Sequence, residues 1–231
     1  MAALRALPHF DGLAIRGLHH TPPAIGTPSS KIETLLTTLR RGSLQELLAA
    51  TRLRILGIDG CVVSDADLAA ISQQRTLTIL ALRHTHVPEA ALADFVRLPR
   101  LHELVVEHSD VTGRDLHGVA GSTSLEIVKF SQTPVGVEFA RYIARCPAVV
   151  ELHLHHKSVN DEFVAELHSH PSIKYLPLIG TSITDYALDD LAQMPSLAVT
   201  QFDDRVTKAG VEEFQRARPD VKVKHPYSTA P

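Results

Sequence analysis

The nine residues LRILGIDGC at positions 53–61 introduce a pattern that recurs along the chain. The same spacing of apolar residues is found in LTILALRHT at 77–85 and in IKYLPLIGT at 173–181. The apolar residue that opens each stretch recurs every 24 residues, at Leu53, Leu77, Leu101, Leu125, Val149, Ile173, Leu197 and Val221. A fixed interval of this length predicts a solenoid, in which each unit buries its apolar side against its neighbours.

Within each unit the apolar period changes from that of a strand to that of a helix. With the opening residue as position 1, apolar residues at positions 4 and 6, such as Leu56 and Ile58, alternate as in a strand. Positions 16 and 19, such as Leu68 and Ile71, have the i, i+3 spacing of a helix face. Helix N-cap residues occupy position 12 in several units, and proline occupies position 23 in most. Each unit therefore predicts a strand, a turn, a short helix and a loop.

The repeated stretches resemble the leucine-rich repeat family. They match its L-x-x-L-x-L-x-x-(N/C/T) motif, and residues 181–191 match the T-x-(V/I)-T-D-x-x-L-x-x-L core of the short bacterial repeat type. The resemblance covers about residues 43–224. It implies an α/β fold, a horseshoe-shaped leucine-rich repeat solenoid with a parallel β-sheet on the concave face and short helices on the convex face.

Two features depart from the repeat pattern. Pro177 lies inside a predicted strand, where it removes a hydrogen bond of the sheet. The seventh unit has Thr200 at position 4, and its valine, Val206, comes one residue early. We expect the solenoid to loosen at this unit.

The two ends of the solenoid need caps, because terminal units lack a neighbour. The expected parts are an N-terminal cap at 1–42, the solenoid at 43–220, and an edge strand with a frayed tail at 221–231. Residues 1–28 predict an irregular segment, whereas residues 29–42 fit either an amphipathic helix, which we favour, or a degenerate repeat. Lys222 and Lys224 are charges that an exposed sheet edge uses against the addition of another strand.

The composition excludes several classes of protein. The 231 residues include 23 Lys and Arg and 26 Asp and Glu without long runs of like charge, which argues against nucleic-acid and membrane partners. No signal peptide is recognisable, and no segment has the roughly 18 to 20 apolar residues that would span a bilayer. Two cysteines, Cys61 and Cys146, are too few for a disulfide framework. We therefore expect a soluble, cytoplasmic protein.

The stretch HLHH at 153–156 places three histidines within four residues. Because side chains alternate along a strand, His153 and His155, at positions 5 and 7, are expected on the open concave face. His156, at position 8, is expected beside the end of the strand. The open face therefore carries the histidines, and two interpretations follow.

One interpretation is a metal- or small-ligand site. Its candidate ligands are His84, His108, His153 and His155, with Glu107 nearby. A metal needs three or four ligand atoms at roughly 2.0 to 2.2 Å from one point, and Gln132 interrupts the position 8 column of His84, His108 and His156. We favour the second interpretation, in which the histidines belong to a polar, partly aromatic surface that contacts another protein, and we expect no cofactor.

The predicted concave face comprises positions 3, 5, 7 and 8 of the units. Its charged members are Asp59, Glu103, Glu107, Glu151, Asp203 and Asp204 against Arg83 and Lys129, a net charge of −4 with neutral histidines. Exposed isoleucine, valine and tyrosine are interspersed among them, a mixture typical of a protein-binding surface. The predicted partner is a protein with a basic or mixed surface patch.

The central part of this face is the predicted partner-binding site. Its residues are Arg83, Glu107, Lys129, His153, His155 and Tyr175. We therefore predict a non-enzymatic protein–protein interaction module that is a monomer, with a self-associating scaffold as an alternative. The family resemblance allows an adaptor, an immunity-type inhibitor of a toxin or an effector.

Overall fold

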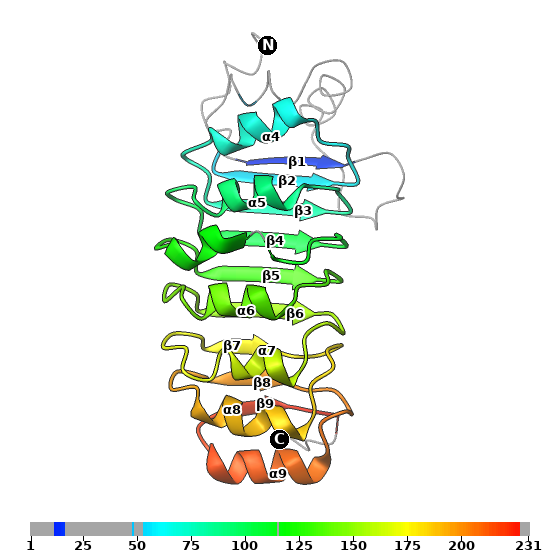
Figure 1. Ribbon diagram of the computed structural model, residues 1–231, viewed down its shortest axis with the longest axis vertical. Coiled ribbons are helices and arrows are strands. Elements are labelled where there is room, and N and C mark those ends of the chain that lie inside the picture. The colour runs from blue at the N-terminus through cyan, green and yellow to red at the C-terminus, as the bar shows by residue number, and fades with distance from the viewer. Residues whose placement is uncertain (1–11, 17–47, 49–52, 115, 227–231) are drawn as a thin grey trace.

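The computed structural model describes residues 12–16, 48, 53–114 and 116–226. These residues form one parallel sheet of nine strands, whose order in the sheet follows their order in the chain (Figure 1). The strands are β1 Gly12–Arg16, β2 Ile55–Asp59, β3 Ile79–Arg83, β4 Glu103–Glu107, β5 Ile127–Ser131, β6 Glu151–His155, β7 Tyr175–Pro177, β8 Val199–Gln201 and β9 Lys222–Lys224.

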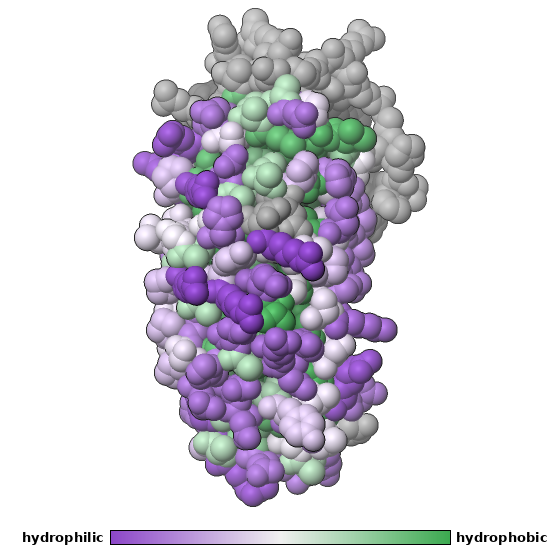
Figure 2. Space-filling view, viewed as in Figure 1, coloured by the Kyte–Doolittle hydropathy of each residue, from purple (hydrophilic) through white to green (hydrophobic). Residues whose placement is uncertain are grey.

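A row of short helices covers one side of the sheet, and Figure 1 views the molecule from that side. The helices are α4 Asp65–Ser72, α5 Glu89–Phe95, the 3-10 helix η1 Leu116–Gly121, α6 Val137–Ile143, α7 Asp161–Ala165, the 3-10 helix η2 Asp185–Ala187, α8 Leu188–Gln193 and α9 Lys208–Ala217. On this side the surface is mostly hydrophilic, with a group of hydrophobic side chains near the loop that joins β2 to α4 (Figure 2). Val62 in that loop is fully exposed.

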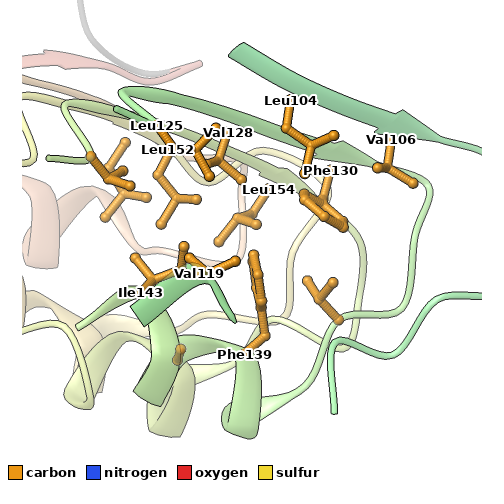
Figure 3. Packing of buried hydrophobic residues seen from close by; sticks show 14 of the residues in the cluster. Leu104, Val106, Val119, Leu125, Val128, Phe130, Phe139, Ile143, Leu152 and Leu154 are labelled. Atoms are coloured by element: carbon orange, nitrogen blue, oxygen red, sulfur yellow. The ribbon is translucent and has the colours of Figure 1, made fainter. Parts of the chain in front are cut away.

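The constant interval keeps the strands in register. The position 4 residues Leu56, Leu80, Leu104, Val128 and Leu152 pair directly across β2 to β6. All of them are buried, and together with the position 6 residues they meet the helices that follow the strands (Figure 3). Each such side chain contributes roughly 1.5 to 3 kcal/mol by its burial. The repeat therefore produces one continuous core.

Carboxylates at the helix starts join consecutive units on the helix side. Asp161 accepts hydrogen bonds from the backbone N–H and the hydroxyl of Thr184, both at 2.7 Å. Asp185 accepts the equivalent pair from Thr207, at 2.8 and 2.6 Å. Because Thr184 and Thr207 also cap their own helices, each link fixes the next helix start.

A second set of polar links runs along the loops that precede the strands, at position 22. His170 is buried there, and its Nε2 lies 3.1 Å from the carbonyl oxygen of Cys146. Its Nδ1 accepts from the backbone N–H groups of Ser172 and Ile173, both at 3.2 Å. The proton of the neutral ring therefore lies on Nε2, which donates to the Cys146 carbonyl.

Acidification is expected to destabilise the fold through His170. Burial lowers the pKa of His170 from its ordinary value of about 6.5, although its backbone hydrogen bonds partly oppose this shift. The unfolded chain therefore binds the proton more readily, so the stabilisation is fully present above about pH 6.5 and is lost as the pH falls. Urea denaturation between about pH 7.5 and pH 5.5 is expected to show this loss.

Substituting His170→Gln is expected to reduce the dependence of the unfolding free energy on pH. Glutamine fits this position, because Gln74 at position 22 of the first unit donates to the Leu48 carbonyl at 2.8 Å. The unfolding free energy of this variant should still depend partly on pH, since burial also lowers the pKa of His153 and of His155. The control His168→Gln removes an exposed histidine; an equal effect of both variants contradicts the assignment.

Pro177 interrupts the sheet as predicted. Strands β2 to β6 pair over five residues each, whereas β6 and β7 share the single pair Glu151↔Tyr175. Pro177 has no N–H to donate, and β7 ends at this residue. Beyond it, Leu178 N–H bonds onward to the Gln201 carbonyl at 2.8 Å. The strands therefore separate where β6 ends in the HLHH stretch.

The seventh unit differs from the prediction of a loosened solenoid. Thr200 pairs with Val223, so this unit is one residue shorter than the others, which accounts for the early position of Val206. Thr200 is fully buried, and its hydroxyl donates to the Leu176 carbonyl at 2.9 Å. The prediction was wrong because this hydrogen bond replaces the missing apolar contact and the sheet continues in register to β9.

The N-terminal segment also differs from expectation. Gly12–Arg16, predicted to be irregular, forms β1 and pairs in parallel with β2 over five residues. Residues 29–42 lie outside the described residues, so the structure does not decide between a helix and a degenerate repeat there.

At the C-terminal end of the sheet, Lys222 and Lys224 are exposed on either side of the buried Val223. In the described part of the chain, no helix is long and apolar enough to cross a membrane.

Candidate functional site

The candidate site is the side of the sheet opposite the helices, which we call the open face. It comprises positions 3, 5, 7 and 8 of the units from β2 to β8. In β6, Leu152 and Leu154 are buried, whereas Glu151, His153 and His155 are partly exposed. The alternation predicted for the HLHH stretch is therefore present, and two of its histidines lie on the open face.

Two ion pairs occupy the centre of the open face. Arg83 Nε lies 2.8 Å from Glu107 Oε2, and Lys129 Nζ lies 2.6 Å from Glu103 Oε1. Each pair joins neighbouring strands, β3 to β4 and β4 to β5. Val105, although on this face, is only 3% exposed. The arginine and the lysine at these positions of β2 to β8 are thus both matched to acids.

A cluster of Glu151, His153 and Tyr175 lies beside these pairs. The ring centroids of His153 and Tyr175 are 4.9 Å apart, and His153 Nε2 lies 3.4 Å from Glu151 Oε2. Burial lowers the pKa of His153, and the adjacent Glu151 carboxylate only partly opposes this. His153 is therefore neutral at neutral pH and presents an aromatic surface rather than a charge.

His155 lies where β6 and β7 separate. Its Nε2 is buried and has no hydrogen-bond partner among the residues that the structure describes. Burial lowers the pKa of His155, while Glu107 acts to raise it. An unpaired buried nitrogen costs about 1 to 3 kcal/mol.

The position 8 residues have an unusual backbone. Gly60 and Gly180 have φ angles of 63° and 69°, and three residues with side chains share this left-handed conformation: His84 at 48°, His108 at 51° and Gln132 at 51°. Glycine adopts this conformation freely, whereas other residues are strained by about 1 to 2 kcal/mol. The spacing of apolar residues does not reveal this strain, although Gly60 and Gly180 in the same column indicate it.

The strain at Gln132 predicts an order of stability for two variants. Gln132→Gly is expected to be more stable to urea than Gln132→Ala by about 1 kcal/mol, because glycine relieves the left-handed strain. At the neighbouring strand residue Ser131 the order should reverse, since glycine costs about 0.5 to 1 kcal/mol there relative to alanine. Alanine being as stable as glycine at position 132 would contradict the strain.

The side chains of His84 and His108 stack at the edge of the open face. Their ring centroids are 4.3 Å apart and their planes differ by 12°. Asp59 Oδ1 lies 3.0 Å from His84 Nδ1. A row of Asp59, His84 and His108 therefore lies along the ends of β2, β3 and β4.

The structure does not assemble the alternative metal site. Within residues 12–16, 48, 53–114 and 116–226, no group of three or more His, Cys, Asp or Glu side chains is placed to hold a metal. A ligated metal lies in the plane of each imidazole, so the stacked, nearly parallel rings of His84 and His108 cannot both face one ion. His153 lies two strands away from His108, so the strand spacing alone separates them by about 10 Å. The four histidines therefore form two separate groups.

The comparisons with known proteins concern the fold. No family model matches the sequence, and no curated protein matches it. Among solved structures, an internalin from Listeria monocytogenes is similar, with a TM-score of 0.60 and 11% sequence identity over 81% of this chain. The fold is a leucine-rich repeat solenoid.

The α/β fold class predicted from the repeats is thereby confirmed. The chain matches 52% of the internalin's length, so the likeness concerns the repeats and not the whole of that protein. The parallel sheet of the leucine-rich repeat solenoid brings together Arg83 with Glu107 and His153 with Tyr175. Lys129 is joined to Glu103, which was expected on the face but not in the central site.

Proposed function

We propose that the chain binds another protein through the open face of its sheet and catalyses no reaction. The observation that supports this most strongly is the continuous row of chemically mixed side chains across the strands from β2 to β8. Exposed apolar residues lie among the charges, with Ile55 and Ile179 at 44% and 36% exposure. Surfaces of this mixed kind are typical of protein interfaces.

The charge of the open face selects the kind of partner. Glu107 and Glu103 are matched by Arg83 and Lys129. The carboxylates beyond these pairs are Asp59, Glu151, Asp203 and Asp204, and they account for the net charge of −4. The proposed partner therefore presents lysine or arginine side chains to this face, which speeds association and fixes the orientation of binding.

The proposed centre of binding is the predicted set Arg83, Glu107, Lys129, His153, His155 and Tyr175. Tyr175 and His153 supply aromatic contact area, which is common in residues that contribute most to binding. His155 is partly exposed on the same strand and supplies further contact area. The ion pairs hold the charged side chains in place before the partner arrives.

A histidine and a serine lie side by side just after β6, and their hydrogen bonds do not support catalysis. His156 Nδ1 lies 2.9 Å from Ser158 Oγ, but that hydroxyl donates to the Val135 carbonyl at 2.7 Å. His156 Nδ1 also accepts from the Ser158 backbone N–H at 3.1 Å. These bonds close a turn, and the serine proton is directed away from the histidine.

The repeats are proposed to be of the short bacterial type, because residues 181–191 match the motif of that type.

The chain is proposed to act as a monomer, because Lys222 and Lys224 are exposed on β9 and disfavour pairing of sheet edges. Light scattering over a concentration series tests this. A mass that rises with concentration would favour the self-associating scaffold instead.

Capture of partners from a lysate of the native host, analysed by mass spectrometry, tests the proposed function. The open-face variant carries His153→Ala and Tyr175→Ala; the matched helix-face variant carries His168→Ala and Tyr186→Ala, which removes the same side-chain types from exposed positions. The proposal expects a protein captured by the wild type and the helix-face variant and lost by the open-face variant. No capture, or capture unaffected by the open-face variant, would contradict it.

A further inference from the structure

The helix side of the solenoid contains a hollow that the proposed function does not use. Its volume is about 480 Å³, and it lies between the loop that follows α5 and the segment from η1 to β5. Its lining comprises Val96, Arg97, Leu98, Pro99, His117, Gly118 and residues 121–124. This volume is within the range of small-molecule sites, roughly 300 to 1,000 Å³.

Two glycines create the hollow. In this unit the helix is replaced by the 3-10 helix η1, which contains Gly118 and Gly121. A Cβ atom on Gly121 would have no atom within 4 Å, so this residue faces open space. A Cβ atom on Gly118 would lie 2.8 Å from the Ala93 carbonyl oxygen and 3.2 Å from Arg97 Nε. Gly118 therefore allows the Arg97 side chain to lie directly against the backbone.

The polar groups of the hollow are positively charged or neutral donors. Arg97 Nη2 lies 3.0 Å from His117 Nε2, so the guanidinium donates to the imidazole and its charge is not cancelled by that bond. Among the described residues that line the hollow there is no carboxylate, and the three hydroxyl residues Ser122, Thr123 and Ser124 lie on the loop opposite. The acid paired with Arg97 is Asp94, at 3.8 Å with both side chains more than half exposed, a weak interaction in water.

We propose that this hollow binds a phosphate-class anion, either free phosphate or the monoester of a small molecule. The Arg97 guanidinium offers several N–H donors in one plane, which match phosphate oxygens. The hydroxyls of Thr123 and Ser124 provide further donors around the same space. Val96, Leu98 and Pro99 form an apolar wall that suits the organic part of a monoester.

Titration with inorganic phosphate and, separately, with phenyl phosphate tests this site in the full chain. Binding is followed by NMR through the His117 ring protons, with sodium chloride at matched ionic strength as the reference. The expected result is saturation with a Kd of about 1 mM for at least one of the two ligands. Saturation by phosphate indicates a free anion site, whereas saturation by phenyl phosphate alone indicates a monoester site.

Variants distinguish a built site from general attraction of anions. Arg97→Gln is expected to weaken binding by about tenfold or more. Its matched control is Arg145→Gln, which removes an exposed arginine from the same position two units later and is expected to change the Kd less than about twofold. Gly121→Leu fills the hollow without changing charge and is expected to abolish saturation. Shifts that never saturate, or equal losses for Arg97→Gln and Arg145→Gln, would overturn the proposal.

Discussion

Replacing Phe139 with alanine is expected to lower the free energy of unfolding by about 3 to 5 kcal/mol. Phe139 is fully buried between the helices and the sheet (Figure 3). Its ring centroid lies 4.9 Å from that of Phe130, and its Cβ occupies the space left by Gly113, where an added Cβ would come within 2.6 Å. The surrounding units are fixed by the sheet register, so the cavity cannot close.

Urea denaturation followed by circular dichroism measures this loss. The matched control is Tyr186→Ala, which removes an aromatic ring that is 87% exposed and is expected to change the stability by no more than about 0.5 kcal/mol. If Phe139→Ala cost no more than this control, the continuous core would not be the main source of stability.

The open-face variant His153→Ala with Tyr175→Ala is expected to weaken binding of the purified partner by about 100-fold or more. Central aromatic residues of interfaces commonly contribute 2 kcal/mol or more each, and tenfold in Kd corresponds to about 1.4 kcal/mol. Because the two rings are in contact, their effects are not expected to add. Isothermal titration calorimetry gives the affinities.

The helix-face variant His168→Ala with Tyr186→Ala serves as the control and is expected to bind within about twofold of the wild type. Equal affinities for the wild type and the open-face variant would place the interface elsewhere. Raising the salt concentration should slow association with the wild type, since the proposed partner is basic and the face acidic.

The repeat pattern was sufficient to predict the fold and the strands from β2 to β7. Alternating apolar residues at positions 4 and 6, such as Leu152 and Leu154, determine which side of each strand is buried. Strand β1 was missed because Leu13 pairs with Leu56 across a much longer interval than the repeat. Periodicity identifies only those strands that keep the period.

The same alternation predicted which residues lie on the open face. It did not predict which of their side chains contact one another. Which acid pairs with Lys129 depends on side-chain reach across strands, and Glu103 accepts it rather than Glu107. The stacking of His84 on His108 depends on a left-handed backbone that apolar spacing does not reveal. The sequence therefore predicts the surface, whereas the distances decide which residues act together.

The central claim, binding through the open face, is tested most directly by labelling histidines with diethyl pyrocarbonate in the free chain and in the complex. His84 and His108 are exposed on the open face, whereas His168 is exposed on the helix side. We predict that the partner slows labelling of His84 and His108 by about tenfold and leaves His168 unchanged. Protection of His168 with unchanged labelling of His84 and His108 would contradict the claim.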